Sequence, residues 1–117
     1  MPTVHVFSSL GRFGSFEAIR SFVDPKYTED GDVVPSPFMS EVQLCSFAPA
    51  CVEVVWVPRA CPLPELLREV SYASQWLVHV DTSLIASEAI CVFAPNEPER
   101  PAGTSLHYCG GYVYDTR

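Results

Sequence analysis

Acidic side chains are the residues of this sequence whose spacing most suggests a function. Glu29, Asp30 and Asp32 surround a single glycine, and Glu41 follows in the same segment. Carboxylates placed so closely could bind a cation or meet a basic partner. A calcium loop, however, needs oxygen ligands at alternate positions and a distal glutamate, and this segment lacks that pattern. Two interpretations remain open, a turn with solvated acids and a surface that binds a basic partner.

The local sequence predicts how residues 27–44 present these acids. Asp30-Gly31 is a strong turn signal, because glycine reaches positive φ without a clash of a Cβ atom. Ser36-Pro37 is typical of a helix start, since the serine hydroxyl can accept from an orphan N–H and the fixed φ of proline suits the first helical position. Binding residues often lie on loops held by a rigid scaffold. We therefore predict that this segment is the functional surface.

Cysteine and histidine form no recognisable catalytic or metal site. A structural zinc site needs four ligands at characteristic spacings, whereas the five cysteines are irregularly spaced and His107 with Cys109 offers two ligands at most. The serines lack the glycine-flanked turn that presents the nucleophile of many hydrolases. We therefore predict no metal, no cofactor and no catalytic activity. The alternative is a small cytosolic enzyme or ligand-binding domain with a pocket near His107 and Cys109.

Length and charge limit the class of partner. The 117 residues are predicted to form one domain over residues 1–117. Fourteen acids against seven bases give a formal net charge of −7, which argues against nucleic acid and anionic membranes, because both attract clustered lysine and arginine. The charge favours a partner with a basic surface, although many proteins are acidic for solubility alone.

The chain is also predicted to be cytoplasmic and to keep its cysteines reduced. No apolar run approaches the roughly 20 residues needed to cross a bilayer, and the N-terminus lacks the pattern of a secretion signal. The hydrophobic fraction of 48% is sufficient for a folded core without cross-links. We expect a monomer or a weak homodimer.

Hydrophobic periodicity predicts an α+β fold. Apolar runs or alternation indicate strands, and apolar residues on one helical face indicate helices. We expect strands at residues 3–8, 51–57, 89–94 and 105–114, and helices at residues 16–23, 37–44, 63–70 and 72–86. The predicted domain is a small, mainly antiparallel sheet of about four strands, with helices packed mostly on one face. Residues 51–57 should form a central strand, or one whose second face meets a partner, and the last two strands should form a hairpin.

The acidic segment also carries a motif. Its residues Tyr27, Glu29-Asp30-Gly31-Asp32, Pro35-Ser36, Phe38 and Glu41 resemble the central motif of the immunity protein 22 family, from bacterial polymorphic-toxin systems. Further positions resemble the same family: Ser71-Tyr72-Ala73, Leu106, Tyr108, Gly110 and Tyr112. The family usually carries acids where residues 45–57 of this chain are poor in charge. The toxin-facing surface is therefore expected to depart from the family more than the fold does.

The resemblance implies that the protein neutralises a cognate bacterial toxin, secreted or delivered by contact and often a nuclease. It implies a steric and electrostatic mechanism, in which acids occupy a cationic active site or substrate groove while aromatic side chains anchor the contact. The predicted toxin-binding residues are Tyr27, Glu29, Asp30, Asp32, Phe38, Glu41 and Tyr112. Two alternatives remain open: these aromatics are ordinary core residues, or the protein is a structural adaptor with no toxin partner.

Overall fold

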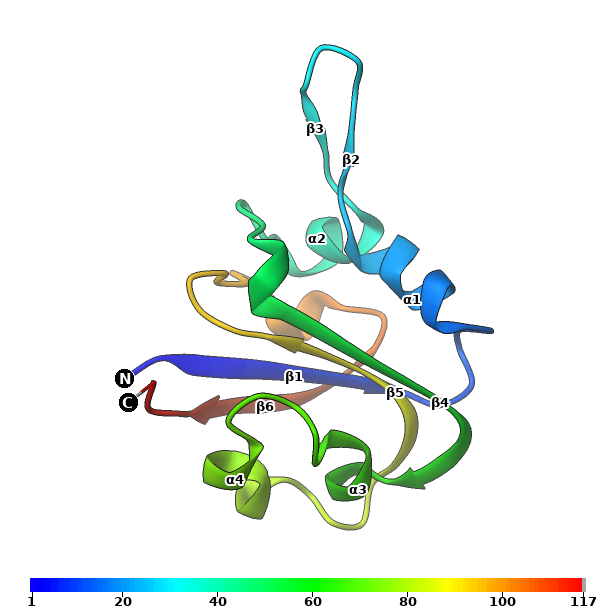
Figure 1. The fold of residues 1–117 in the computed structure, drawn as a ribbon, viewed down its shortest axis with the longest axis vertical. Coiled ribbons are helices and arrows are strands. Elements are labelled where there is room, and N and C mark those ends of the chain that lie inside the picture. Colours follow the sequence, from blue (N-terminus) through cyan, green and yellow to red (C-terminus); the bar gives the residue numbers. More distant parts are fainter. Residues whose placement is uncertain (117) are drawn as a thin grey trace.

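A four-stranded antiparallel sheet forms the centre of the molecule (Figure 1). A computed structural model describes residues 1–116 of the chain. The strands are β1 (Thr3–Ser9), β4 (Val52–Pro62), β5 (Ile85–Val92) and β6 (His107–Val113), in the order β4-β5-β1-β6. Two short strands, β2 (Lys26–Tyr27) and β3 (Val33–Val34), pair with each other in a separate sheet. The predicted α+β class and its antiparallel four-stranded sheet are confirmed.

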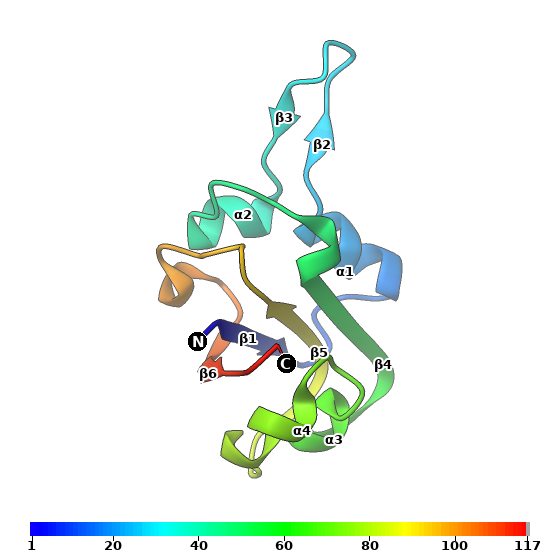
Figure 2. The same ribbon diagram turned by 60° about the vertical axis from the view of Figure 1, so that its left-hand side comes forward.

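Helices cover both faces of this sheet (Figures 1 and 2). One face carries α1 (Phe16–Val23) and α2 (Pro37–Val42), and the other carries α3 (Leu63–Leu67) and α4 (Ala73–Trp76). The short 3-10 helices η1 (Pro49–Cys51), η2 (Leu77–His79) and η3 (Pro101–Gly103) lie in the connections. None of the helices in residues 1–116 is long and apolar enough to cross a membrane.

The division of the helices between two faces differs from the expected packing mostly on one face. The reason lies in the central strand β5, whose side chains alternate between the faces of the sheet. Ala89 and Cys91 belong to the core cluster beside α3 and α4, whereas Ile90 and Val92 belong to the cluster beside α1 and α2. A strand that is apolar on both faces needs a cover on each of them.

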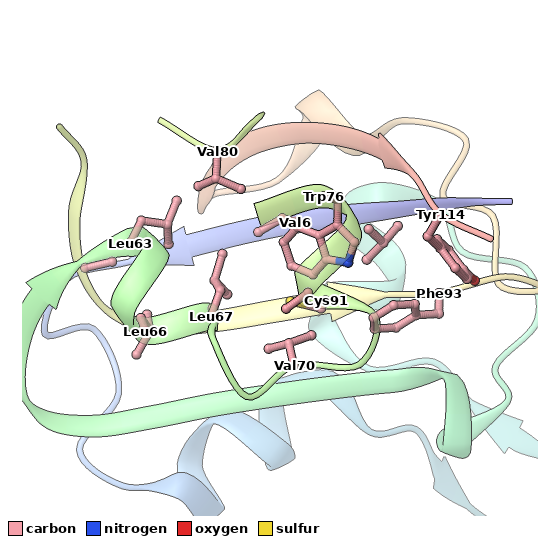
Figure 3. Packing of buried hydrophobic residues seen from close by; sticks show 14 residues of the cluster. Val6, Leu63, Leu66, Leu67, Val70, Trp76, Val80, Cys91, Phe93 and Tyr114 are labelled. Carbon is pink, nitrogen blue, oxygen red and sulfur yellow. The ribbon is translucent and has the colours of Figure 1, made fainter. Parts of the chain in front are cut away.

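One core cluster fills the space between the sheet and the helices α3 and α4 (Figure 3). Leu63, Leu67 and Trp76 are fully buried there against Val6 and Cys91 of the sheet. Burying a large apolar side chain contributes roughly 1.5–3 kcal/mol, so these contacts are a main source of stability. The apolar stripe predicted for residues 63–70 is confirmed, although α3 itself ends at Leu67.

The order of the strands corrects two predictions. β1 lies between β5 and β6 and pairs with both, so the last two strands do not form a hairpin. β4 is an edge strand and not a central one. Its nearly continuous apolar sequence arises from cover on both faces, since Val54 and Trp56 contact the α1 side while Val55 and Val57 contact the α3 side. Hydrophobicity thus reports cover on the faces of a strand, not pairing along its edges.

The segment predicted as a helix over residues 72–86 is helical only in its first half. A polar turn follows η2, in which Asp81 Oδ1 accepts hydrogen bonds from the backbone N–H and the hydroxyl of Ser83, at 2.9 and 2.7 Å. A short polar side chain that bonds to nearby groups in this way competes with the helix. β5 already begins at Ile85, so residues predicted as helical belong to the sheet.

Candidate functional site

Residues 26–35 form an arm that projects from the body of the molecule (Figures 1 and 2). Its legs are β2 and β3, which pair antiparallel. The turn between them is closed by two backbone hydrogen bonds of 2.9 Å, from the N–H of Thr28 to the carbonyl of Asp32 and from the N–H of Gly31 to the carbonyl of Thr28. Gly31 has φ +87°, a conformation that glycine adopts without strain. The predicted turn at Asp30-Gly31 is therefore confirmed.

The arm is exposed along its whole length. The larger apolar side chains on its legs are exposed to about half or more: Tyr27 62%, Val33 54% and Val34 46%. The carboxylates of Glu29, Asp30 and Asp32 lie in the turn, and none of them forms an ion pair with another group in residues 1–116. The arm thus presents unpaired negative charge next to apolar surface.

The first leg of the arm is fixed to the end of α1. The backbone N–H of Asp24 donates to the carbonyl of Arg20 at 2.8 Å, and the carboxylate of Asp24 pairs with the guanidinium of Arg20. Arg20 also donates to the carbonyl of Val52 in β4, at 3.4 Å. At this base lies a hollow of about 220 Å³, lined by Arg20, Asp24, Pro25, Tyr27, Phe47 and Pro49. The exposed ring of Tyr27 therefore borders a recess.

The second leg runs into α2, whose predicted start is confirmed. The hydroxyl of Ser36 accepts a hydrogen bond from the N–H of Met39 at 3.1 Å, and Pro37 is in the first helical turn. Phe38 follows and is fully buried, with its ring edge-on to Phe7 and the centroids 5.1 Å apart. Phe38 therefore ties the arm to the core and is not part of its exposed surface.

Glu41 binds the loop that precedes β6. Its Oε1 accepts hydrogen bonds from the N–H of Ser105 at 2.7 Å and from the hydroxyl of Thr104 at 3.1 Å. The hydroxyl of Ser105 lies 2.9 and 3.0 Å from the two carboxylate oxygens, and accepts from the guanidinium of Arg12 at 2.6 Å. A carboxylate with several donors holds distant segments together, so the contacts of Glu41 give it a structural role.

Tyr112 lies in β6, half-buried, and packs against the core cluster on the face opposite to the arm. Its ring stacks on Trp76, with centroids 5.8 Å apart and an interplanar angle of 15°, and its hydroxyl donates to the carbonyl of Cys109 at 3.1 Å. Of the residues predicted to bind a toxin, the arm brings together Tyr27, Glu29, Asp30 and Asp32. Phe38, Glu41 and Tyr112 lie elsewhere.

The buried carboxylate of Glu88, which sequence reasoning missed, organises the loop between β1 and α1. Glu88 lies in β5 and is 1% exposed. Its Oε1 accepts hydrogen bonds from the hydroxyl of Ser9 at 2.6 Å and the N–H of Arg12 at 3.0 Å, and its Oε2 accepts from the N–H of Phe13 at 3.0 Å. The signal in the sequence that could have indicated this role is the position of Glu88, a single acid directly before an apolar run. With donors on both oxygens, Glu88 satisfies the rule for buried polar groups.

The surroundings of Cys109 do not favour a nucleophilic thiol. Burial raises the pKa of the Cys109 thiol, whereas a nucleophilic cysteine needs a lowered pKa. The sulfur of Cys109 lies 3.3 Å from the hydroxyl of Ser8. Within residues 1–116, no three His, Cys, Asp or Glu side chains are grouped so that they could hold a metal ion.

Comparisons with known proteins place this arrangement in a family. A family model described as Immunity protein 22 matches residues 5–93 of the chain, a range that includes the arm and the helices α1 to α4. The match confirms the family resemblance seen in the sequence. No curated protein and no solved structure matches the chain.

Proposed function

The chain belongs to the immunity protein 22 family, and we propose that it neutralises a cognate bacterial toxin by placing the arm against a basic surface of that toxin. The family supports an immunity function in general, and the arm supplies the specific contact. In this proposal the protein acts in the cytoplasm as a monomer or weak homodimer, without catalysis and without a cofactor. A nuclease is the toxin class that fits best, because its substrate is also a polyanion and its active site must attract negative charge.

The combination of charge and exposure in the arm is the observation that carries this proposal. Three carboxylates lie in one turn with no ion pair to the rest of residues 1–116, on a chain whose net charge is −7. Such a field steers a basic partner and raises the rate of association. The neighbouring Tyr27, 62% exposed, is the type of residue that anchors an interface by filling a pocket.

The arm is also ordered before it meets a partner. Its turn is closed by backbone hydrogen bonds, its first leg is fixed through Asp24 and Arg20, and its second leg is fixed through the buried Phe38. A loop that is already in its bound form loses less conformational entropy on binding. The buried residues of the motif therefore support the contact indirectly, and the exposed ones make it.

The test is a binding-kinetics series with the cognate toxin domain. Reversing two arm charges, Glu29→Lys with Asp30→Lys, should slow association by at least about tenfold at low salt and flatten its dependence on salt. Cells that produce the toxin should lose protection. Adding Asp32→Lys should increase each effect, while dissociation should change less.

A matched control reverses two exposed acids outside the arm, Glu17→Lys with Glu99→Lys, and changes the net charge by the same amount. Glu17 lies in α1 and Glu99 in the loop before η3, and both are exposed. If the two pairs slow association equally, net charge and not the arm is responsible. If reversing all three arm acids leaves association, its salt dependence and protection unchanged, the arm is not the contact surface.

A further inference from the structure

A second candidate surface is the outer edge of β4, with which no strand in residues 1–116 pairs. β4 ends the sheet at one side (Figure 1). The carbonyl of Cys51 accepts from the N–H of Phe93 at 2.8 Å, so the main chain of Cys51 faces β5. Because this direction alternates along an antiparallel strand, the N–H and C=O groups of Val54 and Trp56 face outward.

A furrow runs beside this edge, between β4 and the segment that includes α3. Its main part has a volume of about 420 Å³ and is lined by residues of β4 and by residues 65–70. A second hollow of about 260 Å³ shares Glu53 with the first and includes Tyr72 and Tyr114. Val54 lines the main part although its side chain packs on the opposite face. Its main chain therefore borders the furrow.

The walls of the furrow are apolar and its rim is acidic. Val55 and Val57 of β4 and Leu66 and Val70 of the facing segment contribute apolar side chains. Charged side chains on the lining are the acids Glu53, Glu65 and Glu69 and the base Arg68. Arg68 reaches Glu69 at 4.0 Å, and Glu69 is 92% exposed, so this ion pair is weak. Three acids against one base leave the rim net negative.

We propose that the edge of β4 and this furrow receive an extended, basic segment of the partner protein, which pairs with β4 as an added strand. Strand addition takes its affinity from main-chain hydrogen bonds and its specificity from alternate side chains. Apolar side chains of the segment fill the furrow, and its lysines or arginines meet Glu53, Glu65 and Glu69. The inference rests on the proposed function in one respect, that the toxin is the natural source of the segment.

A second copy of this chain does not fit the same edge. Residues 52–57 contain Glu53 and no base, so two such edges would bring like charges together, which destabilises strand pairing. Proteins usually guard an exposed edge with lysine, proline or a bulge. Here the irregularity of the strand begins after Trp56, and Arg20 donates to the outward carbonyl of Val52, so the unguarded part of the edge is at Val54 and Trp56.

Blocked peptides of about eight residues, the length of an ordinary strand, test the proposal without the toxin. The probe carries valine and lysine in turn at every second position with threonine between them, so that both kinds of side chain lie on the face that meets the furrow, and the comparison peptide carries glutamate in place of lysine. We expect the lysine peptide to bind and to shift the backbone amide resonances of Val54 and Trp56. Along the bound peptide, the amide nitrogens of successive residues alternate between facing β4 and facing away from it. Methylating the nitrogens that face β4 should abolish binding, while methylating the others should not.

Charge reversal on the protein completes the test. Glu65→Lys with Glu69→Lys should weaken binding of the lysine peptide about threefold to tenfold at low salt, a range set by the modest strength of exposed ion pairs. The matched control, Glu17→Lys with Glu99→Lys, should not. Neither pair alters a buried side chain, and an unfolding curve of each variant confirms that it folds.

Several outcomes would overturn the inference: no binding of the lysine peptide at millimolar concentration, equal binding of the glutamate peptide, indifference to both methylations, or self-association of the chain through β4.

The arm reversal, Glu29→Lys with Asp30→Lys, separates this inference from the proposed function. It should abolish protection against the toxin while leaving peptide binding intact. Protection lost without any peptide binding would overturn the β4 site alone, and peptide binding with protection unaffected by the arm reversal would overturn the arm contact alone.

Discussion

In the arm, Glu29, Asp30 and Asp32 are exposed and form no ion pair within residues 1–116, whereas Glu88 in β5 is 1% exposed and accepts three hydrogen bonds. The same chemical group therefore serves two purposes. A carboxylate in water keeps its solvation and is free to attract a partner. A buried carboxylate must be satisfied by donors from the protein, and in return it fixes those donors in place.

Two aromatic residues of the same motif show a similar contrast. Tyr27 is 62% exposed and borders the hollow at the base of the arm. Phe38 is fully buried and contacts the rings of Phe7 and Phe22. The motif thus contains both the contact surface that we propose and the core residue that holds it. Substitutions of the buried residues should therefore lower stability and substitutions of the exposed residues should lower binding, and four experiments test this division.

The largest effect is expected at Phe38. Phe38→Ala should lower the free energy of unfolding by about 3–5 kcal/mol, because a large buried side chain leaves a cavity. Tyr27→Ala should change it by less than about 0.5 kcal/mol. Urea unfolding of both variants measures this difference. Similar losses for the two variants would show that Tyr27 also packs the core.

A somewhat smaller effect is expected at Glu88. Glu88→Ala leaves the hydroxyl of Ser9 and the N–H groups of Arg12 and Phe13 without their acceptor, and unsatisfied buried groups cost about 1–3 kcal/mol each. Partial access of water should limit the loss to about 2–4 kcal/mol. Glu29→Ala is the matched control and should be neutral. Equal stability of the two variants would contradict the distinction between buried and exposed acids.

The loss of stability expected at Glu41 lies between that of the buried Glu88 and that of the exposed Glu29. Glu41→Ala removes the acceptor of the Ser105 and Thr104 groups near the surface, so it should cost about 1 kcal/mol. Faster hydrogen exchange at the Ser105 amide would locate the effect in the loop before β6. If toxin binding falls while stability and exchange are unchanged, Glu41 is a contact residue after all.

The smallest effect is a dependence of stability on pH that comes from the body and not from the arm. Burial lowers the pKa of His5 below its ordinary value of 6.5, although Glu97 partly opposes the shift. The unfolded chain then binds the proton more tightly than the folded chain, so stability should fall as pH drops below about 6.5, until the lower folded pKa is passed.

His5→Gln tests this dependence by difference. The stability of the native protein relative to the variant should decrease between about pH 7.5 and about pH 5.5, as measured by urea midpoints. The arm variants, which carry no change in histidine, should follow the native protein in parallel. A relative stability that rises on acidification would show that the attraction of Glu97 for protonated His5 outweighs burial.

Local features of this protein could be predicted from the sequence because they depend on a few neighbouring residues. The turn at Asp30-Gly31 and the cap at Ser36 are examples, and the structure contains both. The apolar stripe of α3 is buried as its periodicity predicts, whereas that of α1 is buried at Ile19 and Val23 and leaves Phe16 46% exposed. The acids in the arm were also found this way, since their spacing around one glycine is a local property.

Other features were decided by the tertiary structure, because they depend on residues far away in the chain. Phe38 and Tyr27 are both aromatic and belong to one motif, yet the ring of Phe38 meets Phe7 across 31 positions while Tyr27 meets solvent. Glu41 finds its donors at Ser105, 64 positions away. The placement of β1 between β5 and β6, and of β4 at the edge, likewise follows from long-range pairing. The sequence of a strand records how much of its surface is covered but not which strand lies beside it, so the open edge of β4 became visible only in the folded molecule.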